Sequence, residues 1–312
     1  MIESDGGKKI DLAGQGLTAV PEPVRLLSHL EGLDLDRNEL ASLPDWIGRL
    51  THLKSLSLYS NQLTSLPATI WELTGLETLN VSENRLTSLP DQIGNLASLQ
   101  MLDLGHNRFE RIPARIGVLN RLRFLYVSNN HLETVPDSLC DLGALLYLNI
   151  TDNRLTALPE RIGDLSELIE LRLYNNAIAA LPASLGRLAD LKELHMMRNQ
   201  LEALPESIGG LASLRKLGLE GNQITALPDS IGDLQHLTDL DLRNNRVTAL
   251  PASIGKLKRL RFLDLRSNRI TALPDALGGL PQLEKLDLRW NKDLSVPGWI
   301  GELERRGCVV FT

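Results

Sequence analysis

The stretch LTDLDLRNNRVTALP, residues 237–251, holds Leu, Leu, Leu, Asn, Val, Leu and Pro at places that recur along the chain. Asparagine falls at twelve positions spaced 23 residues apart, from Asn38 to Asn291. Proline keeps the same step of 23 residues from Pro21 to Pro297. No insertion or deletion interrupts the register, so the sequence is an array of units that read LxxLxLxxNxLTxLPxxIGxLxx.

Each fixed position of the unit has a physical reason. Leu240 and Leu242 alternate with variable residues, which predicts a short strand with one buried face. Asn245 lies where the chain turns, and a buried amide can satisfy several backbone groups there. Ile231 and Leu234 are spaced as in a short helix or 3₁₀ segment. One unit cannot bury its own leucines, but stacked units can, so the pattern predicts a solenoid.

This unit resembles the leucine-rich repeat. Its LPxxIGxLxxL half is similar to the 23-residue type found in plant intracellular Ras-group leucine-rich repeat proteins and in many bacterial ones, and the resemblance covers about residues 10–311. It implies an α/β solenoid, a horseshoe with a parallel β-sheet on the concave side and short helical or 3₁₀ segments on the convex side. It says little about function, because members of the family bind many unrelated partners.

The register also predicts how the chain is organised. We expect one leucine-rich repeat domain over residues 1–312, without a linker or a second domain. Residues 1–29 form an N-terminal cap with a leading strand, residues 30–297 hold the twelve repeats, and residues 298–312 form a C-terminal cap that ends in a last strand. This gives fourteen strands in all.

Composition limits the class of partner. The chain has 312 residues, of which 43% are hydrophobic and 23% charged, as in a protein that buries a core. A net charge of −6 argues against nucleic acid, because phosphate binding needs basic clusters. No apolar run reaches the length of about 18 residues that a membrane span needs. We therefore expect a protein partner, no nucleic acid, no membrane and a monomer.

The cysteines and the first residues bear on location. Cys140 and Cys308 lie about seven repeats apart, too far for a disulfide, so both are expected to be free thiols. The stretch MIESDGGKKIDL at residues 1–12 carries acids and has no apolar core, unlike a signal peptide. These features favour a cytoplasmic protein, with export as an effector without a classical signal peptide as the alternative.

In a leucine-rich repeat array, the residues that flank the two buried strand leucines point out of the sheet and form three columns. All four tyrosines of the chain fall in these columns, and a cluster of aromatic and Met residues there predicts a recognition patch. Tyr and Phe also simply suit strands, which is the alternative. The predicted partner-binding residues are Tyr59, Met101, Phe124, Tyr126, Tyr147, Arg172, Tyr174, His195, Met197, Arg243, Phe262, Arg266, Arg289 and Trp290.

Charge is uneven between the two halves of the columns. Repeats one to six hold three acids and no Lys or Arg there, whereas repeats seven to twelve hold seven acids and six bases. The motif LDLR recurs at 240–243, 263–266 and 286–289. Either its arginines receive acidic or phosphorylated groups of a partner, or its Asp and Arg residues form a cross-strand ion-pair ladder on a solvated face. The ladder is favoured, because the neighbouring aspartates already occupy the arginines.

Motifs for catalysis are missing from the sequence. DLDRNEL at residues 34–40 differs from a calcium loop, because Glu39 stands where the loop needs glycine. His106 and His131 have no ligand spacing around them, and no phosphate-binding loop or activated nucleophile occurs. We expect no enzyme, no cofactor and no metal. The sequence predicts a recognition module or scaffold that binds a protein partner on its concave face. The alternative is a recruiting or inhibitory subunit of a separate enzyme, possibly a bacterial effector.

Overall fold

The computed structural model describes residues 2–4 and 8–312. The chain divides into two compact units, Met1–Asn153 and Arg154–Thr312. Each unit is described by itself below. Residues 1 and 5–7 of the predicted N-terminal cap lie outside the described residues, and the single domain stays a prediction.

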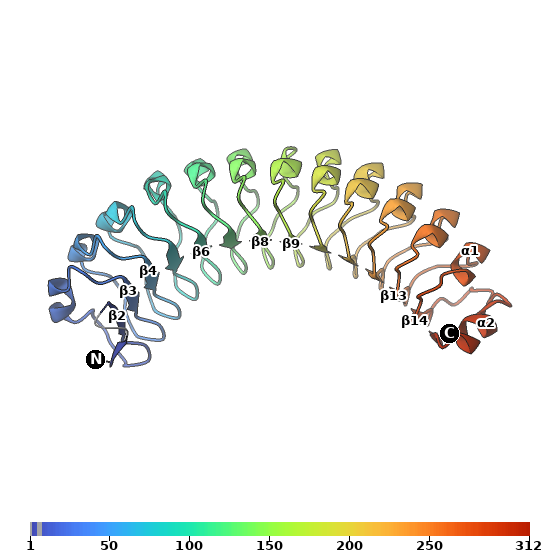
Figure 1. Cartoon of the computed structure of the whole chain (residues 1–312), viewed down its shortest axis with the longest axis horizontal. Helices are drawn as coiled ribbons and strands as arrows, with labels where there is room; N and C mark the ends of the chain where they lie inside the picture. The colour runs from blue at the N-terminus through green and yellow to red at the C-terminus, as the bar shows by residue number, and fades with distance from the viewer. Residues whose placement is uncertain (1, 5–7) are drawn as a thin grey trace. The chain divides into compact units, whose positions relative to one another are not determined.

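The first unit is a stack of turns, each with a three-residue strand on one side and a 3₁₀ segment on the other (Figure 1). Its parallel strands each pair with the next at a constant offset of 23 residues, such as Leu102 with Leu125. They are β2 (Lys9–Asp11), β3 (Gly32–Asp34), β4 (Ser55–Ser57), β5 (Thr78–Asn80), β6 (Met101–Asp103), β7 (Phe124–Tyr126) and β8 (Tyr147–Asn149). The 3₁₀ segments are η1 (Glu22–Leu26), η2 (Asp45–Arg49), η3 (Ala68–Glu72), η4 (Asp91–Asn95), η5 (Ala114–Val118) and η6 (Asp137–Asp141).

The second unit repeats this plan. Its strands are β9 (Glu170–Arg172), β10 (Glu193–His195), β11 (Lys216–Gly218), β12 (Asp239–Asp241), β13 (Phe262–Asp264), β14 (Lys285–Asp287) and β15 (Val309–Phe311). All of them run parallel to their neighbours in this unit. The opposite side carries η7 (Ile162–Asp164), η8 (Ala183–Arg187), η9 (Glu206–Gly210), η10 (Asp229–Asp233) and η11 (Ala252–Lys256), followed by the short helices α1 (Asp275–Gly278) and α2 (Ile300–Arg305).

These elements confirm the predicted fold class, a leucine-rich repeat solenoid with a parallel sheet and short 3₁₀ segments. One strand was not predicted: β1 (Ile2–Ser4) pairs antiparallel with β2, Glu3 lying opposite Ile10. The repeat frame carries no information about it, because it precedes the first repeat. None of the helices in the described part of the chain has the length and apolar character needed to span a bilayer.

The apolar residues that recur at the same positions of each unit form a core of stacked side chains. Strand leucines such as Leu125 and 3₁₀ isoleucines such as Ile116 are fully buried. Each 3₁₀ segment except η7 follows a proline in extended conformation, as Pro113 precedes η5 with φ −66° and ψ 145°. Proline fixes φ and offers no N–H, so it redirects the chain without leaving a donor unpaired.

The repeated asparagines bond neighbouring turns together. The Asn130 amide nitrogen donates to the carbonyl oxygens of Leu104 at 3.1 Å, Val127 at 3.3 Å and Ser128 at 3.1 Å. Its amide oxygen accepts from the Phe109 N–H at 3.0 Å. The asparagine therefore satisfies backbone groups of its own turn and of the turn before it. This is the role that the sequence predicts for the position.

Candidate functional site

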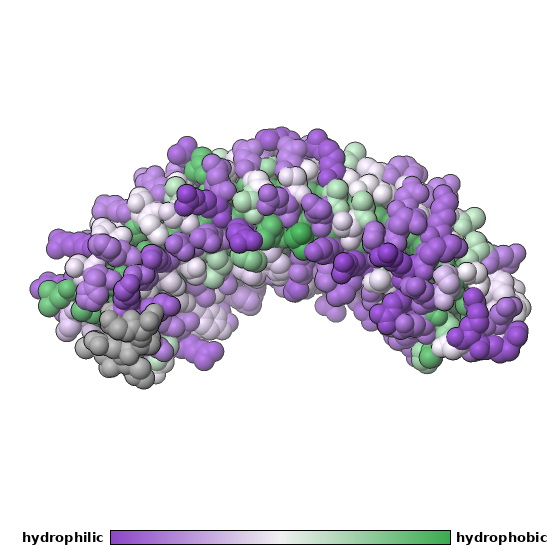
Figure 2. All heavy atoms as spheres, in the orientation of Figure 1, coloured by the Kyte–Doolittle hydropathy of each residue, from purple (hydrophilic) through white to green (hydrophobic). Residues whose placement is uncertain are grey.

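The outward-facing columns lie where the sequence predicts them. In β7, Phe124 and Tyr126 flank the buried Leu125, and both aromatic side chains are half-buried. Most strands show this alternation of half-buried and buried residues. Of the predicted apolar binding residues, only Phe262 and Trp290 count as exposed, at 36% and 64%. Figure 2 shows hydrophobic residues only as small areas among hydrophilic ones on the side it presents.

The first unit brings four of the predicted residues together. Met101, Phe124 and Tyr147 are register partners on β6, β7 and β8. The rings of Tyr126 and Tyr147 have centroids 4.9 Å apart and are tilted by 39°. Aromatic pairs at this distance attract one another, so part of this apolar surface is already used within the unit.

Tyr59 lies beyond the end of β4, in a different setting. The Arg37 guanidinium stands 5.9 Å from the centre of the Tyr59 ring. A hydrogen bond with Glu83, followed by desolvation, raises the pKa of Tyr59 above its usual value. The ring and hydroxyl of Tyr59 are thus engaged by charged neighbours, which makes it a poor apolar anchor.

The second unit contains a groove of about 400 Å³ over β10 to β14. Four of the predicted binding residues line it: His195, Met197, Arg243 and Phe262. Arg172, Tyr174, Arg266, Arg289 and Trp290 do not line it. The remaining lining residues, which sequence reasoning did not assign to the site, are Lys216, Leu217, Gly218, Asp239, Leu240, Asp241, Leu263, Asp264 and Lys285.

Gly218 explains why the groove lies here. It is the register partner of both His195 and Asp241, and it contributes no side chain to the column. A Cβ atom at Gly218 would lie only 2.6 Å from the Met197 sulfur, so the thioether occupies the space that the glycine leaves. A glycine in a column of larger residues was the signal in the sequence that could have located the groove.

One row of residues on the groove combines an apolar centre with opposite charges. Asp239, Phe262 and Lys285 are successive register partners on β12, β13 and β14. The Asp239 carboxylate accepts a hydrogen bond from Thr238, and the Lys285 ammonium lies 5.5 Å from the centre of the Phe311 ring. Neither forms an ion pair with another of the residues that the structure describes. The Asp239 charge nevertheless acts on Lys216 and Arg261, so a basic ligand group would share this carboxylate with them.

The arginines of the LDLR motifs are occupied by aspartates. Arg266 donates from Nε and Nη2 to Asp264 on its own strand, with the Nη2 contact at 2.6 Å, and its Nε lies 3.4 Å from Asp287. Arg243 is bonded in the same way, to Asp241 at 2.9 Å and to Glu220 at 2.7 Å. The arginines are thus occupied by acidic neighbours, as favoured. The shortest Asp–Arg pairs join residues two apart in one turn, and the Asp–Arg contacts between turns are longer, so the ladder is not mainly cross-strand.

In the last pair of the ladder, the aspartate is fully buried and the arginine is partly exposed. Burial raises the pKa of Asp287, but hydrogen bonds from Arg289 and the charges of Arg289 and Arg266 outweigh burial and hold that pKa below its usual value. The Arg289 guanidinium also stacks 4.8 Å from the Phe311 ring and 5.5 Å from the Trp290 ring. Arg289 is therefore engaged by an aspartate and by two aromatic rings of its own unit.

The Asp103 carboxylate on β6 shows what a charge on the sheet surface costs in stability. Its Oδ1 accepts the Gly105 N–H at 2.9 Å, and Asn80 accepts the Ser82 N–H at 3.0 Å in the same position of another turn. Burial is the main cause that raises the pKa of Asp103. A raised folded-state pKa means that the ionised carboxylate costs stability above that pKa and stops costing it as pH falls.

We therefore expect Asp103→Asn to raise the melting temperature at pH 7, because the amide keeps the hydrogen bond without the charge. The gain should shrink as pH falls through the raised folded-state pKa and disappear below about 3, where wild-type Asp103 is protonated in both states. The reverse change, Asn80→Asp, should lower the melting temperature at pH 7. Thermal unfolding across this pH range checks both variants, and a pH-independent difference would contradict the assignment.

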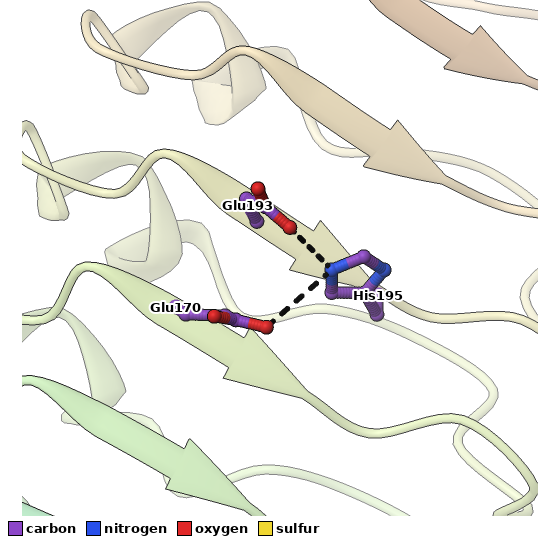
Figure 3. Close-up of side chains that lie close together, drawn as sticks. All are labelled: Glu170, Glu193 and His195. Atoms are coloured by element: carbon purple, nitrogen blue, oxygen red, sulfur yellow. Dashed lines mark hydrogen bonds and ion pairs between the residues drawn. The ribbon is translucent and has the colours of Figure 1, made fainter.

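A second cluster on β9 and β10 was also not predicted. Glu170, Glu193 and His195 place one potential ligand atom each within 4.8 Å of one another (Figure 3). His195 is one of the predicted partner-binding residues, whereas the two glutamates are not. Their proximity follows from the register pairing of Glu193 with Glu170.

Models of known protein families match most of the chain. A model described as leucine rich repeat matches residues 28–86, 51–109, 74–132 and 99–155. A second, described as leucine-rich repeat region, matches residues 134–218 and 204–305. A search of curated proteins found no matching sequence.

Solved structures with the same fold include a bacterial protein and plant receptors. A leucine-rich repeat protein of Leptospira interrogans is 34% identical, with a TM-score of 0.86, over 95% of this chain and 82% of the other. A TDR receptor is 33% identical, with a TM-score of 0.81, over 90% of this chain and 51% of the other. The plant peptide hormone receptor RGFR1, in complex with RGF2, is 28% identical, with a TM-score of 0.73, over 91% and 51%. The chain thus spans about half the length of these two receptors.

Proposed function

The chain belongs to the leucine-rich repeat family, and we propose that it is a non-enzymatic recognition module that binds a protein or peptide segment on its sheet surface. Proteins with this fold commonly serve as interaction modules, and one of its structural relatives is a peptide hormone receptor in complex with RGF2. We also propose that the repeats are of the 23-residue type found in plant intracellular Ras-group proteins. The LPxxIGxLxxL pattern of the repeats supports this assignment.

The observation that carries the proposal is the groove of the second unit. Its row of Asp239, Phe262 and Lys285 offers a ring, 36% exposed, between a carboxylate and an ammonium group that form no ion pair among the described residues. The Arg261 guanidinium lies 5.1 Å from the centre of this ring, so a ligand side chain would pack on the remaining exposed part. An extended segment with an apolar side chain between a basic and an acidic residue complements this row. The backbone beneath is a regular sheet, so little conformational entropy is lost when a ligand binds.

The test is affinity capture from lysate followed by measured affinities of the captured partner. We expect Phe262→Arg to weaken binding by about 30-fold or more, as loss of a central aromatic anchor does. Val296→Arg is the matched control, because Val296 is also exposed, at 52%, and lies outside the groove. Its affinity should equal that of the wild type.

A third variant, Tyr126→Arg with Tyr147→Arg, separates this groove from the aromatic cluster of the first unit. If only this variant loses the partner, the site lies on the first unit and the groove assignment is wrong. If all variants bind equally, the sheet surface is not the binding face. A captured enzyme whose turnover changes on binding would favour the recruiting or inhibitory subunit instead.

A further inference from the structure

Three side chains on β9 and β10 converge on one point. The imidazole Nε2 of His195 lies 3.1 Å from Oε2 of Glu193 and 3.7 Å from Oε1 of Glu170 (Figure 3). Ligand atoms around a four-coordinate Zn²⁺ are about 3.3 Å apart, because each lies about 2.0–2.2 Å from the ion. The two distances to His195 bracket that separation, and all three ligand atoms lie within 4.8 Å of one another, so rotations that bring the two carboxylates closer would complete a ligand set.

The backbone frame holds these groups in place. Glu193 and Glu170 are register partners, and His195 follows Glu193 by two residues on the same face of β10. All three lie on strands and not on loops, so their Cα positions are fixed by the sheet. Rigid elements position metal ligands better than loops do.

The cluster is open to solvent on one side. The side chains of Glu170, Glu193 and His195 are exposed by 20%, 28% and 20%. His195 also lines the groove of the second unit, and the Met197 thioether fills the space over its register partner Gly218. An ion can therefore enter from the groove, and coordination positions not filled by protein face it.

Two cations act on the carboxylates. Lys216 holds Oε1 of Glu193 at 2.9 Å, which leaves Oε2 facing the imidazole, as an outer-sphere donor orients a ligating carboxylate. Arg172 instead bonds Oε1 of Glu170 at 2.5 Å, the oxygen nearest His195, so it competes with an ion.

We propose that Glu170, Glu193 and His195 form a binding site for Zn²⁺ or a similar divalent transition ion at the edge of the groove. One nitrogen and two carboxylate oxygens suit such an ion, whereas Mg²⁺ and Ca²⁺ prefer oxygen ligands alone. The site needs no protein partner, so it stands independently of the proposed function.

The test titrates the full chain, freed of metal with a chelator, with ZnCl₂ by calorimetry, and with Co²⁺ by visible absorption. We expect one ion per chain, with a Kd on the order of 10 µM because only three protein ligands are offered. His195→Gln and Glu193→Gln should each weaken binding about tenfold or more, with unchanged melting temperatures of the metal-free protein. His106→Gln is the control, because His106 lies in the first unit and contacts Asn129 instead.

Substitution of Arg172 should change zinc affinity in the opposite direction. Arg172→Gln removes the competitor for Glu170, so it should tighten zinc binding by several-fold. Weaker or unchanged binding in this variant would remove Glu170 from the ligand set. Absence of zinc binding by the wild type, or binding that persists in His195→Gln, would overturn the site.

Discussion

Asn130→Ala is expected to lower the free energy of unfolding by about 3–5 kcal/mol, because several buried backbone groups lose their partner at once. The amide donates to three carbonyl oxygens and accepts one N–H, and the residue is only 4% exposed. Each unsatisfied buried group costs about 1–3 kcal/mol, and partial relaxation keeps the total below the sum. Urea unfolding of the full chain measures the difference.

The neighbouring residue supplies the control. Asn129 is exposed, has φ of 51° and makes a side-chain hydrogen bond to His106. Asn129→Gly suits this left-handed backbone, so it should change the free energy of unfolding by less than about 1 kcal/mol. Equal losses for the two variants would show that the amide at Asn130 does not bond the turns together as described.

Gly117→Ala is expected to destabilise the chain by about 1–3 kcal/mol through overpacking. A Cβ atom at Gly117 would lie 2.2 Å from the Ser138 carbonyl oxygen and 2.9 Å from the Ser138 Cβ. The first of these is a backbone atom of the adjacent 3₁₀ segment, which cannot move without displacing η6. Thermal and urea unfolding would both report the loss.

Gly143→Ala makes the same chemical change in open space. Nothing lies within 4 Å of a Cβ atom at Gly143, so the variant should be neutral or more stable by about 0.4–1 kcal/mol, because alanine restricts the unfolded chain. The two substitutions in one unit thus differ in sign. If Gly117→Ala were also neutral, the close stacking of η5 on η6 would be wrong.

The fold of the repeats could be predicted because the same pattern of strand and turn residues recurs in each of them. An LxL strand of three residues is too short to identify alone, but the step of 23 residues fixes its register through copies before and after it. β1 could not be predicted, because it lies outside the repeats and no other part of the sequence repeats its pattern. The columns followed from the register, and so did the partners of the LDLR arginines.

The groove and the ion cluster could not be predicted in the same way. The columns placed Phe262, Gly218 and His195 correctly, but the groove depends on which side chain is missing and on where Met197 lies as a result. The cluster depends on rotamers, because Glu193 turns one oxygen to Lys216 and the other to His195. Position in a repeat fixes Cα atoms, and side-chain torsions decide which groups meet.

The constant offset between paired strands, as in Leu217 with Leu240, also governs how the chain folds. Each added turn closes a loop of the same length, so the entropy of closure does not grow as the array lengthens. Relative contact order therefore falls with length, and a nucleus of adjacent turns in either unit extends one turn at a time. Because each turn contacts only its neighbours, damage to one turn should stay close to where it occurs, and amide hydrogen exchange should rise only in that turn and the turns beside it.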